Sequence, residues 1–296
     1  MTAKQLLFFK RTVELGNMTR AAEELLVSQP FLSRVIAGLE EELGVELFDR
    51  RWRKLALNAY GQALYRHVVN IFNEAEDAVK EIQDLKREQA ATLKLVTNVS
   101  TYMCGLLRLL ADSNPDVRIS QYSAPWGEMK EMLLGGKVDF AICVPPQENC
   151  PELEAIELRL EPGVLIYPPG HWLEDYDEID FDEIRDESFI SGSRGYGTRD
   201  VSDAYMAMNN IRPNILIETP DSVSVFKFVA SGLGVAFVPY SQAFADPFFR
   251  EHCVKLKSRA YGKVALCWRR EQYISSAGKL FIEKAREYFG NLPSFD

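Results

Sequence analysis

Three side chains that can hydrogen-bond to DNA bases lie close together near position 30 of this 296-residue chain. Gln29, Ser33 and Arg34 occupy the start of the helix-like segment 28–44, whose acidic run, 40–42, lies at its far end. Gln and Arg can form paired hydrogen bonds with adenine and guanine edges, and Ser can contact bases or phosphates. The residue types therefore suit DNA recognition. A surface helix with a solvated polar face fits this segment alone equally well.

The segments around this helix have the spacing of a helix-turn-helix. Apolar residues recur at helical intervals over residues 3–15, and Gly16 is a natural end for that helix. The segment TRAAEELL predicts a second helix, and Ser28 caps a third in which Pro30 is tolerated in the first turn. One apolar stripe on the third helix is predicted to face the core: Leu32, Val35, Ile36, Leu39 and Leu43. The arrangement predicts a helix-turn-helix with an exposed polar start to its second element.

A basic cluster between two apolar runs follows the third helix. Around Trp52 lie Arg50, Arg51, Arg53 and Lys54. The pattern predicts a two-stranded wing whose basic tip would contact the DNA backbone in a salt-sensitive way. A solvated charged turn is the alternative. Residues 1–66 carry ten Lys and Arg against eight Asp and Glu, although the whole chain has a net charge of −9. Only the N-terminal part is therefore expected to meet a polyanion.

A long helix is predicted from Asn58 to about Glu88, because Gly61 is the only Gly or Pro in this stretch. Its apolar positions alternate in steps of four and three, which is the seam of a two-helix contact: Leu64, Val68, Ile71, Ala75, Ala78, Ile82 and Leu85. At 1.5 Å per residue the helix would be roughly 46 Å long, too long for the core of a small domain. It is expected to pair with a second chain, with packing against its own chain as the alternative.

The remaining two thirds of the chain alternates between strand-like and helix-like segments. Strands are predicted in LKLVTNV, VRISQYS, VDFAICV, GVLIYPP, SFISGS, NILIET and GVAFVP. Helices are predicted at 103–112, 127–135, 198–210, 221–231 and 275–289. This alternation is typical of parallel α/β sheets covered by helices.

Several classes of protein are disfavoured. No run of 18 apolar residues predicts a membrane span, and the five scattered cysteines fit a reducing cytoplasm better than disulfides or zinc. His67, His171 and His252 lack metal-ligand spacing. The segment GYGTRD lacks the third glycine of a dinucleotide fingerprint, and SGSRG falls short of G-x-S-x-G. No catalytic residue, cofactor or metal is therefore expected.

The segment MTRAAEELLVSQPFLSRVIAGLEEELGVELFDR, residues 18–50, resembles the DNA-binding domain of LysR-type transcriptional regulators. Later stretches, including VASGLGVAFVPYS and ALCWRREQYISSAGKLFIEKAREYF, resemble the effector domain of that family. One departure is LNAYG at 57–61, where the family usually begins its next helix with Thr-x-x-Gly. Asn58 is an equally good helix cap.

The resemblance implies an α/β protein of three parts. A winged helix-turn-helix is expected over 1–58, a linker and dimerisation helix over 59–90, and an effector-binding domain over 91–296. That domain would be periplasmic-binding-protein-like, with subdomain I at 91–161 and 268–296 and subdomain II at 162–267. The linker helices of the family pair between subunits, so a homodimer or homotetramer is expected. The residues expected to contact double-stranded operator DNA are Thr19, Arg20, Ser28, Gln29, Pro30, Ser33, Arg34, Arg50, Arg51, Arg53 and Lys54.

A small-molecule effector is expected to bind between the two subdomains. Thr101 and Trp126 match positions that line the cleft in the family, and the Gly-rich segment SGSRGYGTRD leads into a helix N-terminus. Hydroxyls, free N–H groups and an arginine there would suit an anion; an ordinary surface loop is the alternative. The full set expected to bind the effector is Ser100, Thr101, Trp126, Ser193, Arg194, Tyr196, Thr198 and Ser222. A solute-binding module or small-molecule enzyme with an N-terminal helical appendage is the rival interpretation.

Overall fold

The structure is a computed structural model that describes residues 1–49, 55–86, 92–144, 150–258, 261–293 and 295. The chain forms two compact units, Met1–Val79 and Lys80–Asp296. Among the described residues, no helix is long and apolar enough to cross a membrane.

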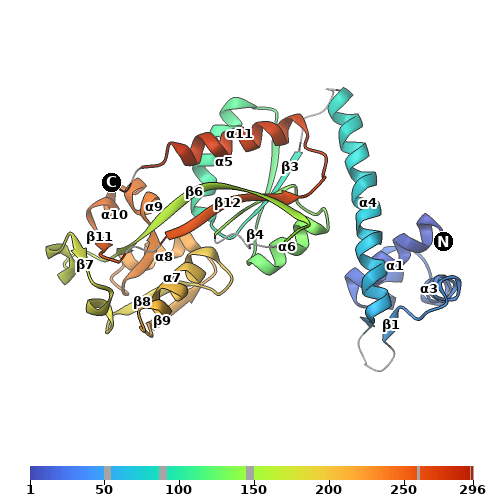
Figure 1. Ribbon diagram of the computed structural model, residues 1–296, viewed down its shortest axis with the longest axis horizontal. Helices are drawn as coiled ribbons and strands as arrows, with labels where there is room; N and C mark the ends of the chain where they lie inside the picture. Colours follow the sequence, from blue (N-terminus) through green and yellow to red (C-terminus); the bar gives the residue numbers. More distant parts are fainter. Residues whose placement is uncertain (50–54, 87–91, 145–149, 259–260, 294, 296) are drawn as a thin grey trace. The chain divides into compact units, whose positions relative to one another are not determined.

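The first unit consists of helices followed by a short two-stranded sheet and most of a long helix, α4, whose last turns from Lys80 belong to the second unit (Figure 1). In chain order these elements are α1 (Ala3–Leu15), α2 (Met18–Glu24), α3 (Gln29–Leu43), β1 (Phe48–Asp49), β2 (Ala56–Leu57) and α4 (Ala59–Lys86). Phe9, Leu32 and Leu39, which are completely buried, lie at the centre of its apolar core. The strands β1 and β2 are antiparallel. The predicted helix-turn-helix and long helix are confirmed.

The helix ends of the first unit follow directly from capping residues. Asn17 Oδ1 accepts hydrogen bonds from the N–H groups of Thr19 and Arg20, at 2.9 and 3.1 Å. Ser28 Oγ accepts from the N–H of Phe31 at 3.4 Å, so Ser28 caps α3 as predicted. Asn58 caps α4 by accepting from the N–H of Gly61 at 2.9 Å. These caps satisfy N–H groups that have no partner within their own helix.

The second unit is an α/β structure with one large mixed sheet and a small two-stranded sheet. The strand order of the large sheet is β4-β3-β5-β12-β6-β11-β7, and β10 also pairs with β6. Its strands are β3 (Thr92–Thr97), β4 (Arg118–Ser123), β5 (Phe140–Cys143), β6 (Leu153–Ile166), β7 (Glu178–Ile179), β10 (Ala236–Pro239), β11 (Cys253–Leu256) and β12 (Tyr261–Arg269). The small sheet pairs β8 (Ser188–Gly192) with β9 (Asn214–Thr219).

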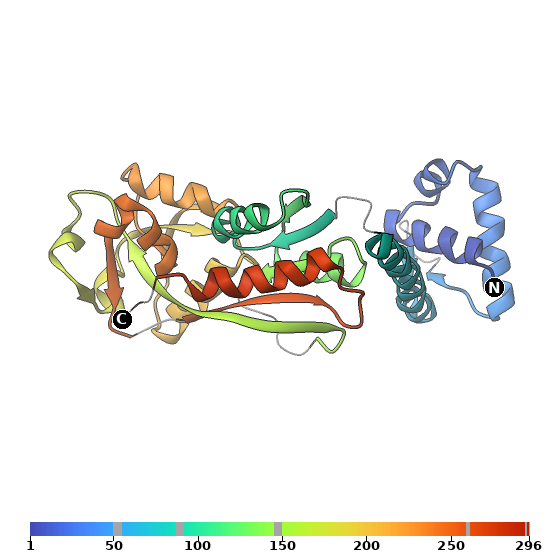
Figure 2. The ribbon, with the colours of Figure 1, turned by 90° about the horizontal axis from the view of Figure 1, so that it is seen from above.

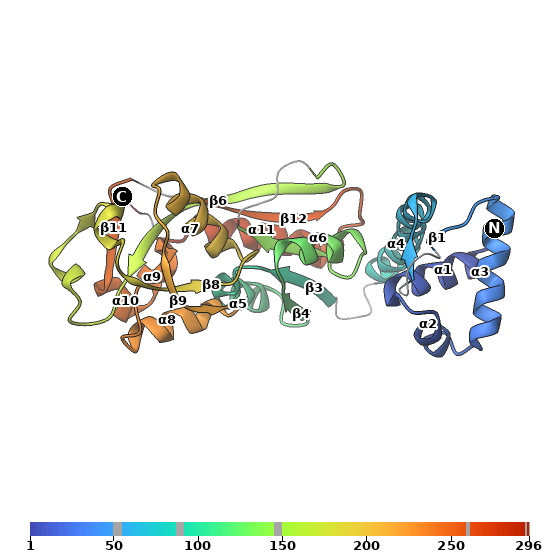
Figure 3. The same cartoon turned by 90° about the horizontal axis from the view of Figure 1, so that it is seen from below.

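Helices cover these sheets on both sides (Figures 2 and 3). They are α5 (Met103–Ser113), α6 (Trp126–Leu134), α7 (Gly197–Met208), α8 (Ser222–Ala230), α9 (Tyr240–Ala245), α10 (Pro247–Glu251) and α11 (Ser276–Gly290), with the short 3-10 helix η1 (Ser100–Tyr102) before α5. We call β3–β5 with α5, α6 and α11 lobe I, and β7–β11 with α7–α10 lobe II. Separate apolar clusters fill the two lobes.

Two long strands connect the lobes. In Figure 1, β6 and β12 run side by side, and they pair antiparallel from Arg269↔Leu153 to Tyr261↔Pro162. Beyond that pairing, Ile166 of β6 contacts β10 and β11 in lobe II. The apolar pattern alone predicted parallel sheets and a strand only at the end of β6, so it missed the antiparallel pairing of β6 with β12. The subdomain bounds implied by the family resemblance, 161/162 and 267/268, fall within these two strands. The first half of β6 has mostly partly buried and exposed positions, and the charged residues Glu157 and Arg159 interrupt its apolar pattern.

Candidate DNA-binding surface and effector site

All the described residues predicted to contact DNA have exposed side chains. They lie at the starts of α2 and α3: Thr19, Arg20, Ser28, Gln29, Pro30, Ser33 and Arg34. Neither helix has an acidic residue in its first turn. Exposed N–H groups and the positive end of the helix dipole at these termini favour phosphate oxygens. The surface is therefore chemically suited to a phosphate backbone, and it also carries the exposed side chains of Gln29 and Arg34.

The wing is described only at its base. Phe48 pairs with Leu57 and Asp49 with Ala56, so an antiparallel pair of strands flanks the basic cluster as predicted. Arg50, Arg51, Arg53 and Lys54 themselves lie outside the described residues.

The apolar stripe of α3 is shorter than predicted. Leu32, Ile36 and Leu39 are buried in the core, whereas Leu43 is 39% exposed. The prediction for Leu43 was wrong because Leu43 is the last residue of α3, where Gly44 turns the chain into the left-handed region at φ 70°.

The predicted seam of α4 divides into two parts. Val68 is completely buried and Leu64 is partly buried, and both belong to the apolar core of the first unit. Val68 is therefore committed to its own chain, which differs from the prediction. The other five seam positions are exposed: Ile71, Ala75, Ala78, Ile82 and Leu85. They leave an apolar line along the outside of a single helix.

The candidate effector residues of the two lobes approach one another directly. Ser100 Oγ, in η1 of lobe I, lies 3.0 Å from Ser222 Oγ, at the first turn of α8 in lobe II. Trp126 donates its backbone N–H to the carbonyl of Gly195 at 3.1 Å. The Gly-rich segment predicted to line the site thus contacts the opposite lobe. Trp126 begins α6, and its side chain is only 9% exposed within a lobe I cluster.

Two glycines allow this close contact. Gly195 has φ +84°, and a Cβ at this position would come within 2.8 Å of Pro125 Cβ. A Cβ on Gly197 would lie 1.8 Å from the carbonyl oxygen of Val144, which is a backbone atom and cannot turn aside. Glycine is therefore required where lobe II meets lobe I.

Asn98 is a buried polar residue at this contact that the sequence interpretation missed. Its side chain donates to the carbonyl of Val144 at 3.1 Å and accepts from the Val144 N–H at 3.0 Å. It also donates to the carbonyl of Gly195 at 3.4 Å. The available signal was an amide directly after the apolar run of β3, at the carboxyl end of a parallel strand, where α/β proteins bind ligands.

The other predicted residues of lobe II surround the start of α7. Tyr196 precedes the first turn of α7, and Thr198 and Ser193 are partly buried. Arg194 is exposed. Thr101, on the lobe I side, is partly buried in η1.

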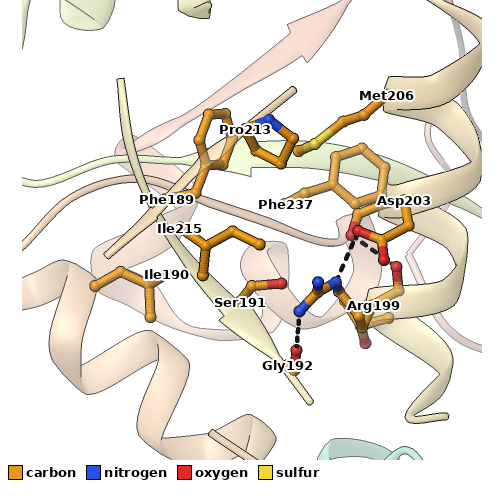
Figure 4. A pocket seen from close by; sticks show the side chains of 12 residues that line it. Phe189, Ile190, Ser191, Gly192, Arg199, Asp203, Met206, Pro213, Ile215 and Phe237 are labelled. Carbon is orange, nitrogen blue, oxygen red and sulfur yellow. Dashed lines mark hydrogen bonds and ion pairs between the residues drawn. The ribbon is translucent and has the colours of Figure 1, made fainter. Parts of the chain in front are cut away.

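Arg199 occupies a small pocket inside lobe II (Figure 4). Its side chain is 4% exposed and pairs with Asp203 at 2.7 Å and Glu218 at 2.9 Å. It also donates to the carbonyl of Gly192 at 3.0 Å. These bonds tie α7 to β8 and β9. Burial disfavours the positive charge of Arg199, but Asp203 and Glu218 raise its pKa. The guanidinium therefore stays charged, and the two carboxylates balance that charge. Arg199 is therefore a structural residue and not a free anion receptor.

Comparison with known proteins agrees with this architecture. Residues 3–62 match the bacterial regulatory helix-turn-helix protein, lysR family, and residues 86–290 match the LysR substrate binding domain. The transcriptional regulator YybE of Bacillus subtilis (strain 168) is 32% identical over 244 residues, covering 81% of this chain and 82% of YybE.

Two solved structures share the fold. Full-length CbnR complexed with its target DNA matches with a TM-score of 0.62 at 22% identity, covering 97% of this chain and 100% of CbnR. The effector binding domain of QuiR in complex with shikimate matches with a TM-score of 0.55 at 22% identity, covering 68% of this chain and 98% of that domain.

The fold and the family matches together define a DNA-binding regulator of transcription with an effector-binding domain. The chain belongs to the LysR family, which is non-enzymatic.

Proposed function

We propose that this regulator reads its operator through the first half of α3. Support comes from the exposed Gln29, Ser33 and Arg34 at a helix start that has no acidic residue in its first turn. CbnR, which shares the fold, has been solved with its target DNA. The N–H groups of α3 and its neighbouring basic residues would hold the backbone, and the Gln and Arg side chains would read bases.

Salt dependence of binding to duplex DNA tests this proposal against a solute-binding or enzymatic role. Each phosphate neutralised by Lys or Arg releases a condensed cation, so the logarithm of the affinity should fall linearly with the logarithm of salt concentration. Arg20→Ala should lessen that slope. An exposed arginine of the second unit, between α7 and β9, supplies the matched control Arg212→Ala, which should leave the slope unchanged. Absence of duplex binding at low salt would favour the rival role.

We propose that a small effector binds between lobe I and lobe II. The direct contacts of Ser100 with Ser222 and of Trp126 with Gly195 support this, because a ligand held by both sides would change them. QuiR, with a similar effector domain, is known in complex with shikimate. The sequence favours an anionic effector. Because Arg199 is already paired with Asp203 and Glu218, Arg194 is the arginine that would bind such an anion. A thermal-shift screen of small aromatic and aliphatic acids, repeated with Thr101→Val and Arg194→Ala, tests this site.

We propose that two chains pair along α4, in a homodimer or in the pairs of a homotetramer. Ile71, Ile82 and Leu85 are 50%, 55% and 75% exposed on one chain. Burying apolar surface between two chains would stabilise the pair by about 25 cal/mol for each Å² removed from water. The exposed positions also continue the four-and-three spacing that is typical of paired helices. The part of α4 near Val68 would instead anchor the winged helix-turn-helix. Effector binding and DNA binding would then be linked through the spacing of the paired heads.

We also propose the boundaries 1–58, 59–90 and 91–296 for the three functional parts, with the lobes divided along β6 and β12. Support comes from the end of α4 at Lys86 and from the course of the two connecting strands.

A further inference from the structure

The last two turns of α4 belong to the second unit, which begins at Lys80. They carry two apolar residues of the proposed pairing seam, Ile82 and Leu85, and both are exposed. A helix turns by about 100° per residue, so Lys80 and Asp84 lie together on the face opposite Ile82 and Leu85. The apolar face of this segment is therefore turned away from the residues that meet lobe I.

A cavity of about 260 Å³ lies between this end of α4 and the apolar core of lobe I. Lys80, Gln83 and Asp84 line it on the α4 side. Leu93 and Phe140, which are buried in an apolar cluster of lobe I, line it on the other side. A space of this size is large enough for several water molecules. The end of α4 is therefore not packed closely on these apolar residues, and polar contacts must hold it.

Asp84 forms three hydrogen bonds with the segment that begins α11. One carboxylate oxygen accepts from the Tyr273 hydroxyl at 2.9 Å and from the Ser276 N–H at 3.0 Å, and the other accepts from the Ser276 hydroxyl at 2.5 Å. Ser276 is the first residue of α11, where N–H groups lack partners within the helix and the helix dipole favours a carboxylate. The hydrogen bond from the Ser276 hydroxyl is the main cause that lowers the pKa of Asp84, so this carboxyl group is ionised at neutral pH.

Lys80 adds an ion pair on the same face of α4. Its Nζ lies 2.8 Å from Oδ1 of Asp139, and the other oxygen of Asp139 accepts from the Lys94 N–H at 2.8 Å. The Lys80 side chain is 39% exposed, so water screens this pair and it contributes little. Asp84 is therefore the main residue that ties the end of α4 to lobe I.

Helix ends fray unless tertiary contacts hold them, and Ile82 and Leu85 can pair with a second chain only while their turns stay helical. We propose, on the basis of the α4 pairing proposed above, that Asp84 is a positioning residue of the pairing surface. It ties the last two turns of α4 to the start of α11, and so keeps Ile82 and Leu85 in line with the rest of the seam. A movement of α11 in lobe I is then passed to the seam through this contact.

Hydrogen exchange and sedimentation equilibrium of the full-length chain test this role. Asp84→Ala should make the amides of residues 80–86 exchange about 10-fold faster and weaken chain pairing about 10-fold, as expected when hydrogen bonds to a charged group are lost. Ser276→Ala changes lobe I and leaves α4 intact. It should have the same two effects to a smaller extent, because the Ser276 N–H remains. The double variant should go no further than Asp84→Ala, since both changes act through one contact.

Two control variants separate this role from a general loss of stability. Ser275 caps α11 by accepting from the Gly278 N–H at 3.2 Å. Ser275→Ala should therefore lower the stability of the second unit while leaving chain pairing unchanged. Glu76→Ala removes the same charge as Asp84→Ala from an exposed position about two turns earlier on α4, and it should also leave pairing unchanged.

The role of Asp84 is overturned if Asp84→Ala pairs as the parent does, whether or not its hydrogen exchange changes. It is also overturned if Ser275→Ala or Glu76→Ala weakens pairing as much as Asp84→Ala does. A parent chain that sediments as a monomer would contradict the α4 pairing itself, and this inference with it. A parent that associates and is unaffected by Asp84→Ala contradicts only the inference about Asp84.

Discussion

The hydroxyl oxygens of Ser100 and Ser222 lie 3.0 Å apart, so a hydrogen bond joins lobe I to lobe II at the proposed effector site. Ser222 opens α8, whose first turn is capped by Asp221, and Ser100 begins η1. An effector between these helix starts would replace a direct contact between lobes with contacts through itself. Such a ligand changes the balance between lobe arrangements only by its difference in affinity for them.

The first prediction concerns the close approach at Gly197. A Cβ there would meet the backbone of Val144, so Gly197→Ala should force the lobes apart and lower the free energy of unfolding by about 1–3 kcal/mol. Denaturant unfolding measures the loss, and small-angle X-ray scattering of the full-length chain should show expansion. Gly127→Ala is the control, because a Cβ on Gly127 meets no atom within 4 Å. Equal stability of the two variants would contradict the close contact.

The second prediction concerns pH and the cap of α8. Asp221 accepts from the Ser224 hydroxyl at 2.5 Å and from the Val223 N–H at 3.0 Å. The Ser224 hydrogen bond is the main cause that lowers the pKa of Asp221 below its ordinary value of 3.8. A lowered pKa in the folded state means that the ionised cap adds stability above the ordinary pKa, and that this stability is lost as pH falls through the folded value.

Asp221→Asn isolates that contribution, since an amide keeps one acceptor but does not titrate. The stability difference between parent and variant, measured by urea unfolding, should be largest near neutral pH and should shrink as the pH falls below about 3.8. A difference that stays constant with pH would show that the Asp221 charge does not stabilise α8.

The third prediction tests the exposed seam of α4. Ile71→Asp leaves the single chain folded, because Ile71 is 50% exposed there. It would bury a carboxylate in an apolar helix pair, which costs several kcal/mol, so the oligomer should dissociate to monomers. Asn70→Asp adds the same charge on an exposed neighbour outside the seam and should sediment as the parent. An Ile71→Asp variant that also sediments as the parent would rule out this seam.

The fourth prediction concerns strain in the turn between α2 and α3. Leu26 is 91% exposed and has φ +54°. Its N–H and that of Val27 close the end of α2 onto Glu23 and Ala22, a position where glycine is usual. Leu26→Asn should raise the free energy of unfolding by about 1 kcal/mol, because Asn tolerates this conformation and no packing is lost. Leu26→Ala keeps the strained Cβ and should not stabilise; a comparable gain in both variants would exclude strain as the cause.

Sequence reasoning recovered the elements whose signals are local. Ser28 and Asn58 were recognised as caps because one side chain satisfies a nearby N–H group, and the helices of the second unit follow their apolar periodicity. The antiparallel pairing of β6 with β12 has no such local signal, and the change of subdomain within these strands followed only from the family resemblance. Their pairing joins residues about a hundred positions apart, and charged residues such as Glu157 and Arg159 interrupt the apolar pattern of β6.

In the candidate sites, too, local features were predicted from the sequence and features that depend on tertiary contacts were not. Exposure of Gln29 and Arg34 follows from which face of α3 is apolar, so residue types and spacing were sufficient. The roles of Arg199 and Val68 depend on tertiary partners: two carboxylates from different elements neutralise the first, and the core of the first unit encloses the second. Asn98 was missed because it carries no motif, and its importance comes from its burial and from its hydrogen bonds to Val144 and Gly195.

Selection of duplex DNA from a random pool tests the central claim most directly. The full-length protein should enrich one sequence, and Gln29→Ala and Arg34→Ala should each weaken binding to that sequence by about 1–3 kcal/mol. Gln29→Ala should scarcely change the affinity for random duplexes, because contacts with the phosphate backbone supply that affinity. Failure to enrich any sequence, or equal losses on selected and random DNA, would contradict sequence reading by α3.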